Sequence, residues 1–248
     1  MASTTGPLLG GQPFYGFDIG IILLQNDAPR PLGDVGNAGT WDFPVLYAVA
    51  DEAVPERVVE RSAEGLLPSF TRAARWLETN GVRAISTSCG FIALYQRELA
   101  AAVSVPTATS SLLQVPSALR TLRPDQRVCV LTINARTLTS SHLVGAGLQD
   151  DEIERLRIVG LEESQHLYPA IIQGRRELDV DAARAEMVAA ACQAVEEHPD
   201  IGAFVFECTN MPPYASAVQQ ATGRPVWDAV TLIESLRSGV RRQSWPTS

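Results

Sequence analysis

Short apolar runs alternate along this chain with longer segments in which apolar residues recur at helical spacing. The pattern predicts strong strands at 15–24, 82–86, 127–133 and 201–206, and weaker ones at 105–109, 156–160 and 224–227. The segments between them predict helices, among them 55–80, 91–103 and 179–197. Nearly continuous apolar runs are typical of strands buried on both faces of a parallel sheet. The alternation therefore predicts an α/β fold in which helices cover parallel sheets.

The order of these segments indicates a coarse duplication. A strand, a long helix, a strand that ends near a cysteine and a further helix occur once before about residue 105 and again after about residue 125. We therefore predict two similar parallel-sheet lobes related by a pseudo-two-fold axis, with the active site in the cleft between them. The first lobe is expected at 1–108, joined by the C-terminal segment 215–248, and the second at 109–214.

A long polar segment at 25–44 separates the first predicted strand from the first helix. Loops of this length are commonly functional or disordered. Its glycines allow backbone N–H groups to approach a small anion, and the Asn37 side chain adds hydrogen bonds. The segment is interpreted as a binding loop, with a simple surface excursion as the alternative.

Two cysteine motifs lie where a predicted strand gives way to a predicted helix: Ser86-Thr87-Ser88-Cys89-Gly90 and Glu207-Cys208-Thr209-Asn210. Parallel sheets bind their ligands at the carboxyl ends of the strands. A helix N-terminus there favours the ionised form of a thiol. The sequence therefore predicts two reactive thiols, Cys89 and Cys208, that face one pocket.

The other two cysteines, Cys129 and Cys192, have apolar neighbours and are predicted to be part of the core. No C-x-x-C pair or cysteine-histidine spacing indicates zinc, so we expect reduced thiols and no metal. His142 and His198 fall in or beside predicted helices and are expected at the surface, while His166 is a weaker pocket candidate.

Composition narrows the classes of function. The formal net charge of -8 and the lack of a basic cluster argue against nucleic acid or an anionic membrane as partner. The chain contains no lysine, which excludes a lysine Schiff base with pyridoxal phosphate or a carbonyl substrate. No apolar run approaches the roughly 20 residues that span a bilayer, and no signal peptide is apparent, so a cytoplasmic location is expected.

The cysteine motifs, the loop Gly33-Asp34-Val35-Gly36-Asn37 and the ending Pro225-Val226-Trp227-Asp228 together resemble the aspartate/glutamate racemase superfamily. The resemblance implies two α/β lobes, no cofactor, proton transfer by two cysteines and, commonly, a homodimer. The chain departs from glutamate racemases in one respect, because Thr209 is followed by Asn210 and not by histidine. Asp18 is the nearest candidate for the aspartate that those enzymes carry after the first strand.

The leading hypothesis is a racemase or epimerase that acts on a small, amino-acid-like carboxylate. Cys89 and Cys208 remove and return a proton on opposite faces of the carbon next to the carboxylate. Preorganised donors hold the carboxylate where negative charge develops. The predicted substrate-binding residues are Asn37, Thr87, Ser88, Gly90, Thr132, Asn134, Thr209 and Asn210, with Arg30 and Arg136 as further carboxylate partners.

Other chemistries fit the same cysteine pair. A lyase or decarboxylase, for example one similar to dimethylsulfoniopropionate lyases, needs one thiol for proton transfer and the other only to assist. A maleate-type cis-trans isomerase adds one cysteine to a double bond. A catalytically silent sensor that kept the pocket is the non-enzymatic alternative, in which neither thiol is unusually reactive.

Overall fold

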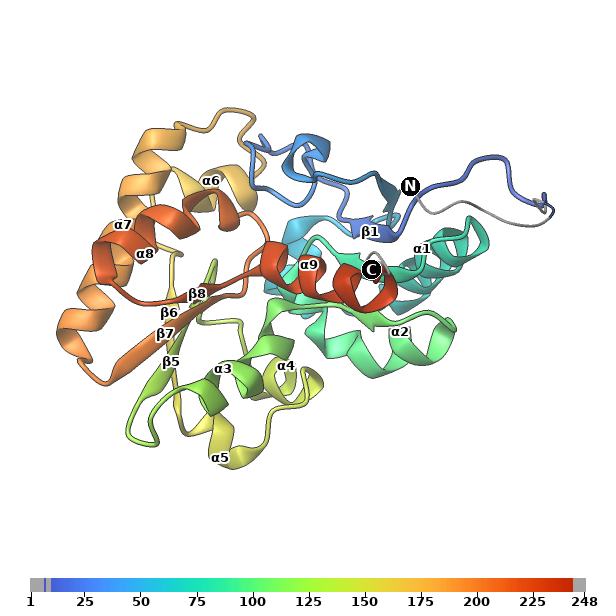
Figure 1. The fold of residues 1–248 in the computed structure, drawn as a ribbon. Helices are drawn as coiled ribbons and strands as arrows, with labels where there is room; N and C mark the ends of the chain where they lie inside the picture. The colour runs from blue at the N-terminus through green and yellow to red at the C-terminus, as the bar shows by residue number, and fades with distance from the viewer. Residues whose placement is uncertain (1–6, 8–9, 243–248) are drawn as a thin grey trace, which may run out of the picture.

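The computed structural model describes residues 7 and 10–242, which form two four-stranded parallel sheets (Figure 1). The first sheet has the order β2-β1-β3-β4 and the second the order β6-β5-β7-β8. The strands of the first are β1 (Ile19–Leu23), β2 (Val45–Val49), β3 (Ala84–Thr87) and β4 (Thr107–Ala108). Those of the second are β5 (Arg127–Thr132), β6 (Leu156–Gly160), β7 (Ile201–Phe206) and β8 (Val226–Trp227).

The two sheets have the same topology. In each, the first strand lies between the second and the third, and the fourth extends the sheet beyond the third. All pairings are parallel, so β3 and β7 end at the corresponding edge of their sheets. The predicted α/β fold with two similar parallel-sheet lobes is confirmed.

Helices cover both sheets (Figure 1). The α-helices are α1 (Leu67–Thr79), α2 (Gln96–Ala102), α3 (Val115–Thr121), α4 (Ser140–Gly145), α5 (Asp150–Ile153), α6 (Leu167–Ile171), α7 (Val180–Glu197), α8 (Ala215–Thr222) and α9 (Ala229–Val240). Shorter turns of other helix types are η1 (Ala38–Thr40), η2 (Glu56–Glu60), η3 (Gly90–Tyr95), η4 (Ser111–Gln114) and η5 (Pro212–Tyr214).

The predicted helix at 55–80 is divided in the structure. A π-helical turn, η2, is followed by Ser62 and Ala63 with positive φ, and α1 begins only at Leu67. Positive φ cannot continue a right-handed helix, so the chain turns here. Pro68 lies in the first turn of α1, where the missing N–H is tolerated, and does not kink the helix.

Strand β2 was not predicted from the sequence. It directly follows the polar segment 25–44 and pairs with β1 at the edge of the first sheet. Its residues are half-buried or exposed, in contrast to the fully buried strands that the apolar pattern identified. The first strand is also shorter than predicted, because it begins at Ile19.

The C-terminal segment 215–248 was expected to join the first lobe as a whole. In the structure, α8 packs on α7 and β8 pairs with β7, so both belong to the second lobe. Helix α9 packs against β3 and β4 of the first sheet. The segment is divided because β8 completes the second sheet before the chain crosses back. Residues 243–248 lie outside the described part.

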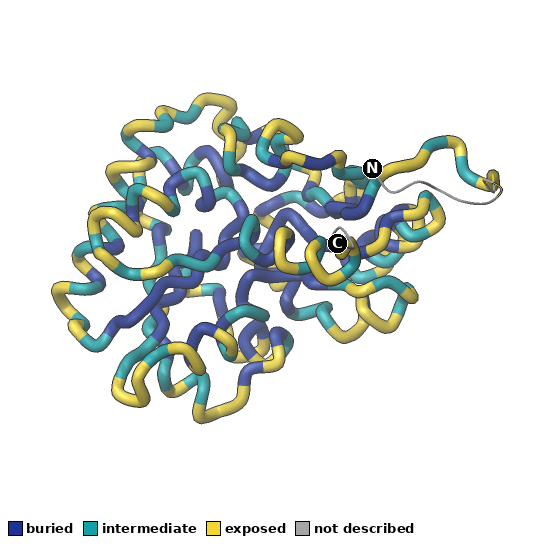
Figure 2. Tube along the Cα trace, in the orientation of Figure 1, coloured by how far each residue is buried: buried dark blue, intermediate teal, exposed yellow. Residues whose placement is uncertain are grey.

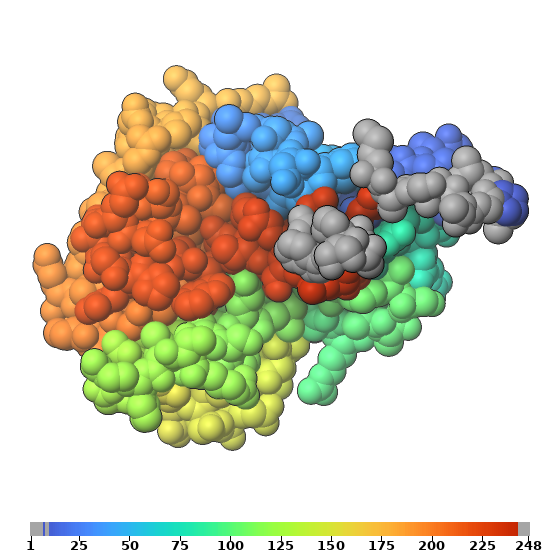
Figure 3. Space-filling view, in the orientation of Figure 1, coloured from blue at the N-terminus to red at the C-terminus, as the bar shows by residue number. Residues whose placement is uncertain are grey.

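The loop between β1 and β2 crosses from the first lobe to the second, where it lies against the second lobe (Figure 3). Gly33 has a φ of +98°, and a Cβ on it would lie 2.8 Å from the Cα of Pro213. Glycine is therefore required for this close approach. The contact fixes the loop over the cleft.

The inner strands β1, β3, β5 and β7 and the edges at which β3 and β7 end are buried (Figure 2). Cys129 is fully buried in β5, as predicted, and Cys192 is half-buried in α7. Among the described residues, no helix combines the length and the apolar character that crossing a membrane requires.

Candidate active site

Cys89 and Cys208 line one cavity between the two lobes. Cys89 lies just after β3 and is the N-cap of η3, and Cys208 lies just after β7. Each is only 7% exposed. The lining residues come from both lobes. The duplicated topology thus brings two thiols, distant in sequence, to one small enclosed space.

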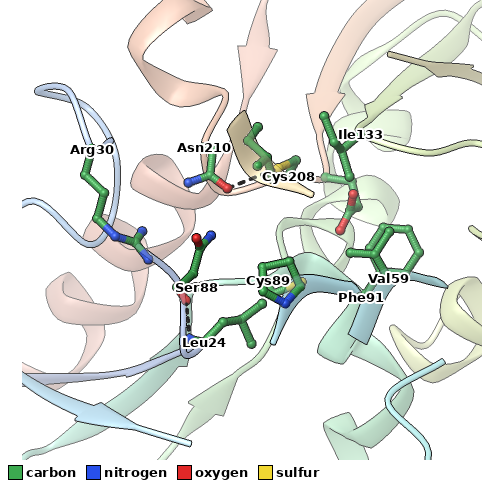
Figure 4. Close-up of a pocket in the computed structure, with 13 residues that line it drawn as sticks. Leu24, Arg30, Val59, Ser88, Cys89, Phe91, Ile133, Cys208 and Asn210 are labelled. Carbon is green, nitrogen blue, oxygen red and sulfur yellow. Dashed lines mark hydrogen bonds between the residues drawn. The ribbon is translucent and has the colours of Figure 1, made fainter. Parts of the chain in front are cut away.

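The cavity has two chemically different sides (Figure 4). Arg30, Ser88 and Asn210 lie on one side of the sulfur atoms. Apolar side chains lie on the other side, namely Val59, Phe91 and Ile133. A ligand held here lies between polar groups that include Arg30 on one side and mainly apolar side chains on the other.

The buried carboxylate of Asp34 organises the polar side. It accepts hydrogen bonds from Arg30 Nη1 at 2.8 Å, from the Gly36 N–H at 2.7 Å and from Asn210 Nδ2 at 2.5 Å. Because the amide nitrogen of Asn210 is held by Asp34, its Oδ1 is directed to Cys208, whose Sγ donates at 3.6 Å. Asp34 therefore fixes both Arg30 and Asn210 in place.

The thiol-bearing turns of the two lobes are hydrogen-bonded to each other. Thr209 Oγ1 donates to the Ser88 carbonyl at 2.6 Å, and Ser111 Oγ donates to the Phe206 carbonyl at 2.5 Å. The Ser88 hydroxyl accepts from the Leu24 N–H at 3.0 Å. The Thr209–Ser88 bond directly joins the segments that follow β3 and β7.

Glu207 also lines the cavity, and its side chain is fully buried. Thr132 Oγ1 donates to its Oε2 at 2.7 Å, whereas Oε1 has no hydrogen-bond partner among the described residues. A Cβ on Gly90 would lie 2.3 Å from Oε1, so the lack of a side chain at Gly90 leaves room for the carboxyl group. Burial raises the pKa of Glu207 to about 8, although the Thr132 hydrogen bond acts in the opposite direction.

Both thiols have a raised pKa. Burial is the largest cause for Cys89 and for Cys208, followed by the charge of Glu207. The backbone N–H groups of Phe91 and Asn210 lower the pKa of Cys89 and Cys208 respectively, but by less. Burial therefore outweighs the strand-end N–H groups, which were expected to favour the ionised thiols.

The chain is 32% identical over 222 residues to a dimethylsulfoniopropionate lyase from Durusdinium sp. clade D, a match that covers 86% of this chain and 71% of that protein. The chain belongs to the dimethylsulfoniopropionate lyase family. Dimethylsulfoniopropionate lyase 3 from Emiliania huxleyi is 33% identical over 230 residues, which covers 88% of this chain but 58% of that protein. The chain thus spans little more than half the length of this relative.

Solved structures with the same fold are those of other enzymes. Arylmalonate decarboxylase superposes with a TM-score of 0.57 at 16% identity, covering 90% of this chain and 91% of that one. A glutamate racemase from Francisella tularensis gives a TM-score of 0.55 at 15% identity, covering 92% and 85%. No family model matches the sequence. Together with the dimethylsulfoniopropionate lyase relatives, this fold confirms the predicted resemblance to the aspartate/glutamate racemase superfamily.

The structure brings only part of the predicted binding set to the cavity of this lyase-family chain. Ser88 and Asn210 line it together with the thiols. Thr87 and Thr209 donate to backbone carbonyls, and Thr132 holds Glu207. The remaining predicted residues are used elsewhere, since Gly90 packs on Glu207, Asn134 accepts from the Arg136 N–H, and Asn37 caps η1.

Sequence reasoning missed Glu207 and Asn26 as lining residues. Glu207 was visible as an acidic residue directly after a fully apolar strand, a position that the structure buries. Arg30 lines the cavity as predicted, whereas Arg136 forms ion pairs with Glu162 and Glu163 and its side chain is 69% exposed.

Three further expectations are corrected. Asp18 precedes β1, at the end of the strand away from the thiols, and pairs with arginines there. His142 is not at the surface, because its ring is buried against Phe91 with centroids 4.9 Å apart, and burial lowers its pKa to about 4. His166 is not among the residues that line the cavity.

Within residues 7 and 10–242, no group of three His, Cys, Asp or Glu side chains is placed to hold a metal ion.

Proposed function

We propose that this chain is a lyase that cleaves dimethylsulfoniopropionate, releasing dimethyl sulfide and leaving acrylate. The observation that carries the proposal is the pair of thiols, Cys89 and Cys208, placed between a cationic and an apolar side of one enclosed cavity. Membership of the dimethylsulfoniopropionate lyase family supports the same substrate.

The polar side suits the carboxylate of this substrate. Arg30 uses Nη1 for Asp34, and a guanidinium has five N–H donors, so further donors remain for a ligand. Asn26 and Ser88 add neutral polar groups on the cavity wall. A carboxylate bound here leaves its neighbouring carbon beside the thiols and its far end beside Phe91.

The reaction then needs one base. A thiolate removes a proton from the carbon next to the carboxylate, and the electron pair of that C–H bond forms the new double bond. The C–S bond breaks with its electrons remaining on sulfur, so the leaving group is the neutral thioether. The protonated thiol afterwards returns its proton to water. The positive charge of the bound sulfonium lowers the pKa of a nearby thiol, which offsets the rise caused by burial.

Racemisation, the leading prediction from the sequence, is the second candidate. Two thiols on one cavity suit proton removal and return on opposite faces, and the fold is shared with a glutamate racemase. Family membership favours the lyase. A homodimer and a cytoplasmic location stay predictions.

Proton NMR in heavy water with purified protein separates these functions. With dimethylsulfoniopropionate, we expect vinyl signals of acrylate to appear and dimethyl sulfide to be detected in the headspace by gas chromatography. A panel of amino acids tested in the same way should show no exchange of the α-proton for deuterium. Exchange without elimination would replace the lyase by a racemase.

A further inference from the structure

The Glu207 carboxyl group is a buried acid that the elimination described above does not use. It lies on the cavity wall, its Oε2 is occupied by Thr132, and its Oε1 has no partner in the described part of the chain. A buried ionised carboxylate is costly unless a cation or several donors accompany it. We therefore expect the ionised Glu207 carboxylate to find its partner in a ligand bound in the cavity.

The position of Glu207 relative to the two sides is set by its contacts. Thr132, which holds it, immediately precedes Ile133, and Gly90, against which it packs, immediately precedes Phe91. Ile133 and Phe91 both lie on the apolar side, away from Arg30 (Figure 4). The cavity thus has a guanidinium on one side and an acid on the other.

Among residues 7 and 10–242, no cationic side chain forms an ion pair with Glu207. The groups that titrate near it are the thiols of Cys89 and Cys208, which carry no positive charge in any form. His142, which packs behind Phe91, is neutral at ordinary pH, because burial lowers its pKa to about 4. Arg30 is already paired with Asp34.

We propose that Glu207 and Phe91 form a subsite for the cationic end of the substrate, with the Glu207 carboxylate as counter-ion to an alkylated onium group. The aromatic ring attracts the same cation through its face and accepts its methyl groups. This inference rests on the proposed function and extends it, because it assigns the residue that selects a charged leaving group. With Arg30 at the other end, a zwitterion is bound in one orientation only.

The test uses two ligands of the same shape and different charge, and proton NMR after each titration checks that neither has been converted. One is 3-(trimethylammonio)propionate, and the other is 4,4-dimethylpentanoate, in which a neutral carbon replaces the charged nitrogen. Isothermal titration calorimetry at pH 8 gives the ratio of their dissociation constants. For the natural chain we expect a preference for the cation of about tenfold or more.

Glu207→Gln should lower that preference about tenfold, mainly by weakening the cation, while the neutral ligand binds as well as before or better. Thr132→Val removes the hydrogen bond to Oε2 and should reduce the preference partially. Glu162→Gln is the matched control, since Glu162 is partly buried in the same lobe but does not line the cavity, and it should leave the ratio unchanged.

An unchanged ratio in Glu207→Gln, or failure of the natural chain to prefer the cation, overturns the proposal. If Glu207→Gln does not fold, the partial loss in Thr132→Val decides in its place. The lyase assay tests the proposed function independently of this binding measurement. Release of dimethyl sulfide without a Glu207-dependent preference leaves only the function standing, and a Glu207-dependent preference without release leaves only the subsite.

Discussion

The two lobes place different side chains at corresponding positions beside their thiols. The N–H of Ser88 donates to the Ile22 carbonyl in the first lobe, and the N–H of Glu207 donates to the Leu131 carbonyl in the second. Each of these residues follows the third strand of its sheet and precedes a cysteine. A neutral hydroxyl therefore stands in one lobe where an acid stands in the other.

This difference shows how a duplicated scaffold obtains a directional site. The backbone supplies two equivalent thiols, which a symmetric pair of lobes presents to any small ligand. Arg30 on one side and the buried Glu207 on the other remove the equivalence. Charge, and not backbone topology, then decides which end of a substrate faces which side of the cavity.

The largest effect is expected from the thiols themselves. Elimination needs one base, so Cys89→Ala and Cys208→Ala should both fold but differ in activity, with one losing about a thousandfold in kcat and the other less. Headspace measurement of dimethyl sulfide, with circular dichroism as the check on folding, gives the comparison. Equal and complete loss in both, with deuterium exchange into an amino acid by the natural chain, would restore the two-base racemase.

Arg30→Gln tests the cationic side. Loss of the charged hydrogen bonds to the substrate carboxylate should raise KM for dimethylsulfoniopropionate about ten- to a hundredfold, with a smaller change in kcat. Arg136→Gln is the control, since this arginine lies at the surface and pairs with Glu162 and Glu163. An equal rise of KM in both variants would remove Arg30 from the binding site.

Glu207→Gln tests the acidic side through stability in the absence of ligand. The pKa of Glu207 is raised from 4.5 to about 8, so the folded chain binds the proton more tightly than the unfolded chain. Stability is therefore lost as the pH rises from about 4.5 towards 8, at about 1.4 kcal/mol per pH unit.

The variant lacks this titration, so its stability relative to the natural chain should be greater at pH 8 than at pH 5. Urea unfolding of both chains at each pH measures the difference, and the titration of His142 cancels because both chains contain it. A constant difference across this range would mean that Glu207 is ionised in the folded protein.

Gly90→Ala should give the smallest of these effects. The added Cβ would meet the Glu207 carbonyl oxygen at 2.2 Å and Oε1 at 2.3 Å, which the backbone cannot absorb freely. We expect a loss of about 1–3 kcal/mol in the free energy of unfolding. Gly147→Ala is a useful reference. An alanine at this positive φ is strained, but no atom lies within 4 Å of the added Cβ. Equal losses in the two variants would argue against a clash at Gly90.

The sequence by itself determined the strands buried on both faces, their duplication and the place of both thiols at strand ends. These features are local, because an apolar run and the polar residue that ends it are adjacent in the chain. Strand β2 escaped this reasoning because it lies at a sheet edge and alternates little in burial.

Only the tertiary structure decided which polar side chains face the cavity. Thr132 ends β5 and Asn134 follows two residues later. Thr132 holds Glu207, which comes from a distant segment, whereas Asn134 accepts from the local backbone and caps a turn. The raised pKa of the thiols likewise depends on burial by both lobes. A side chain's neighbours, and with them its charge, are set by packing between segments that are far apart in the sequence.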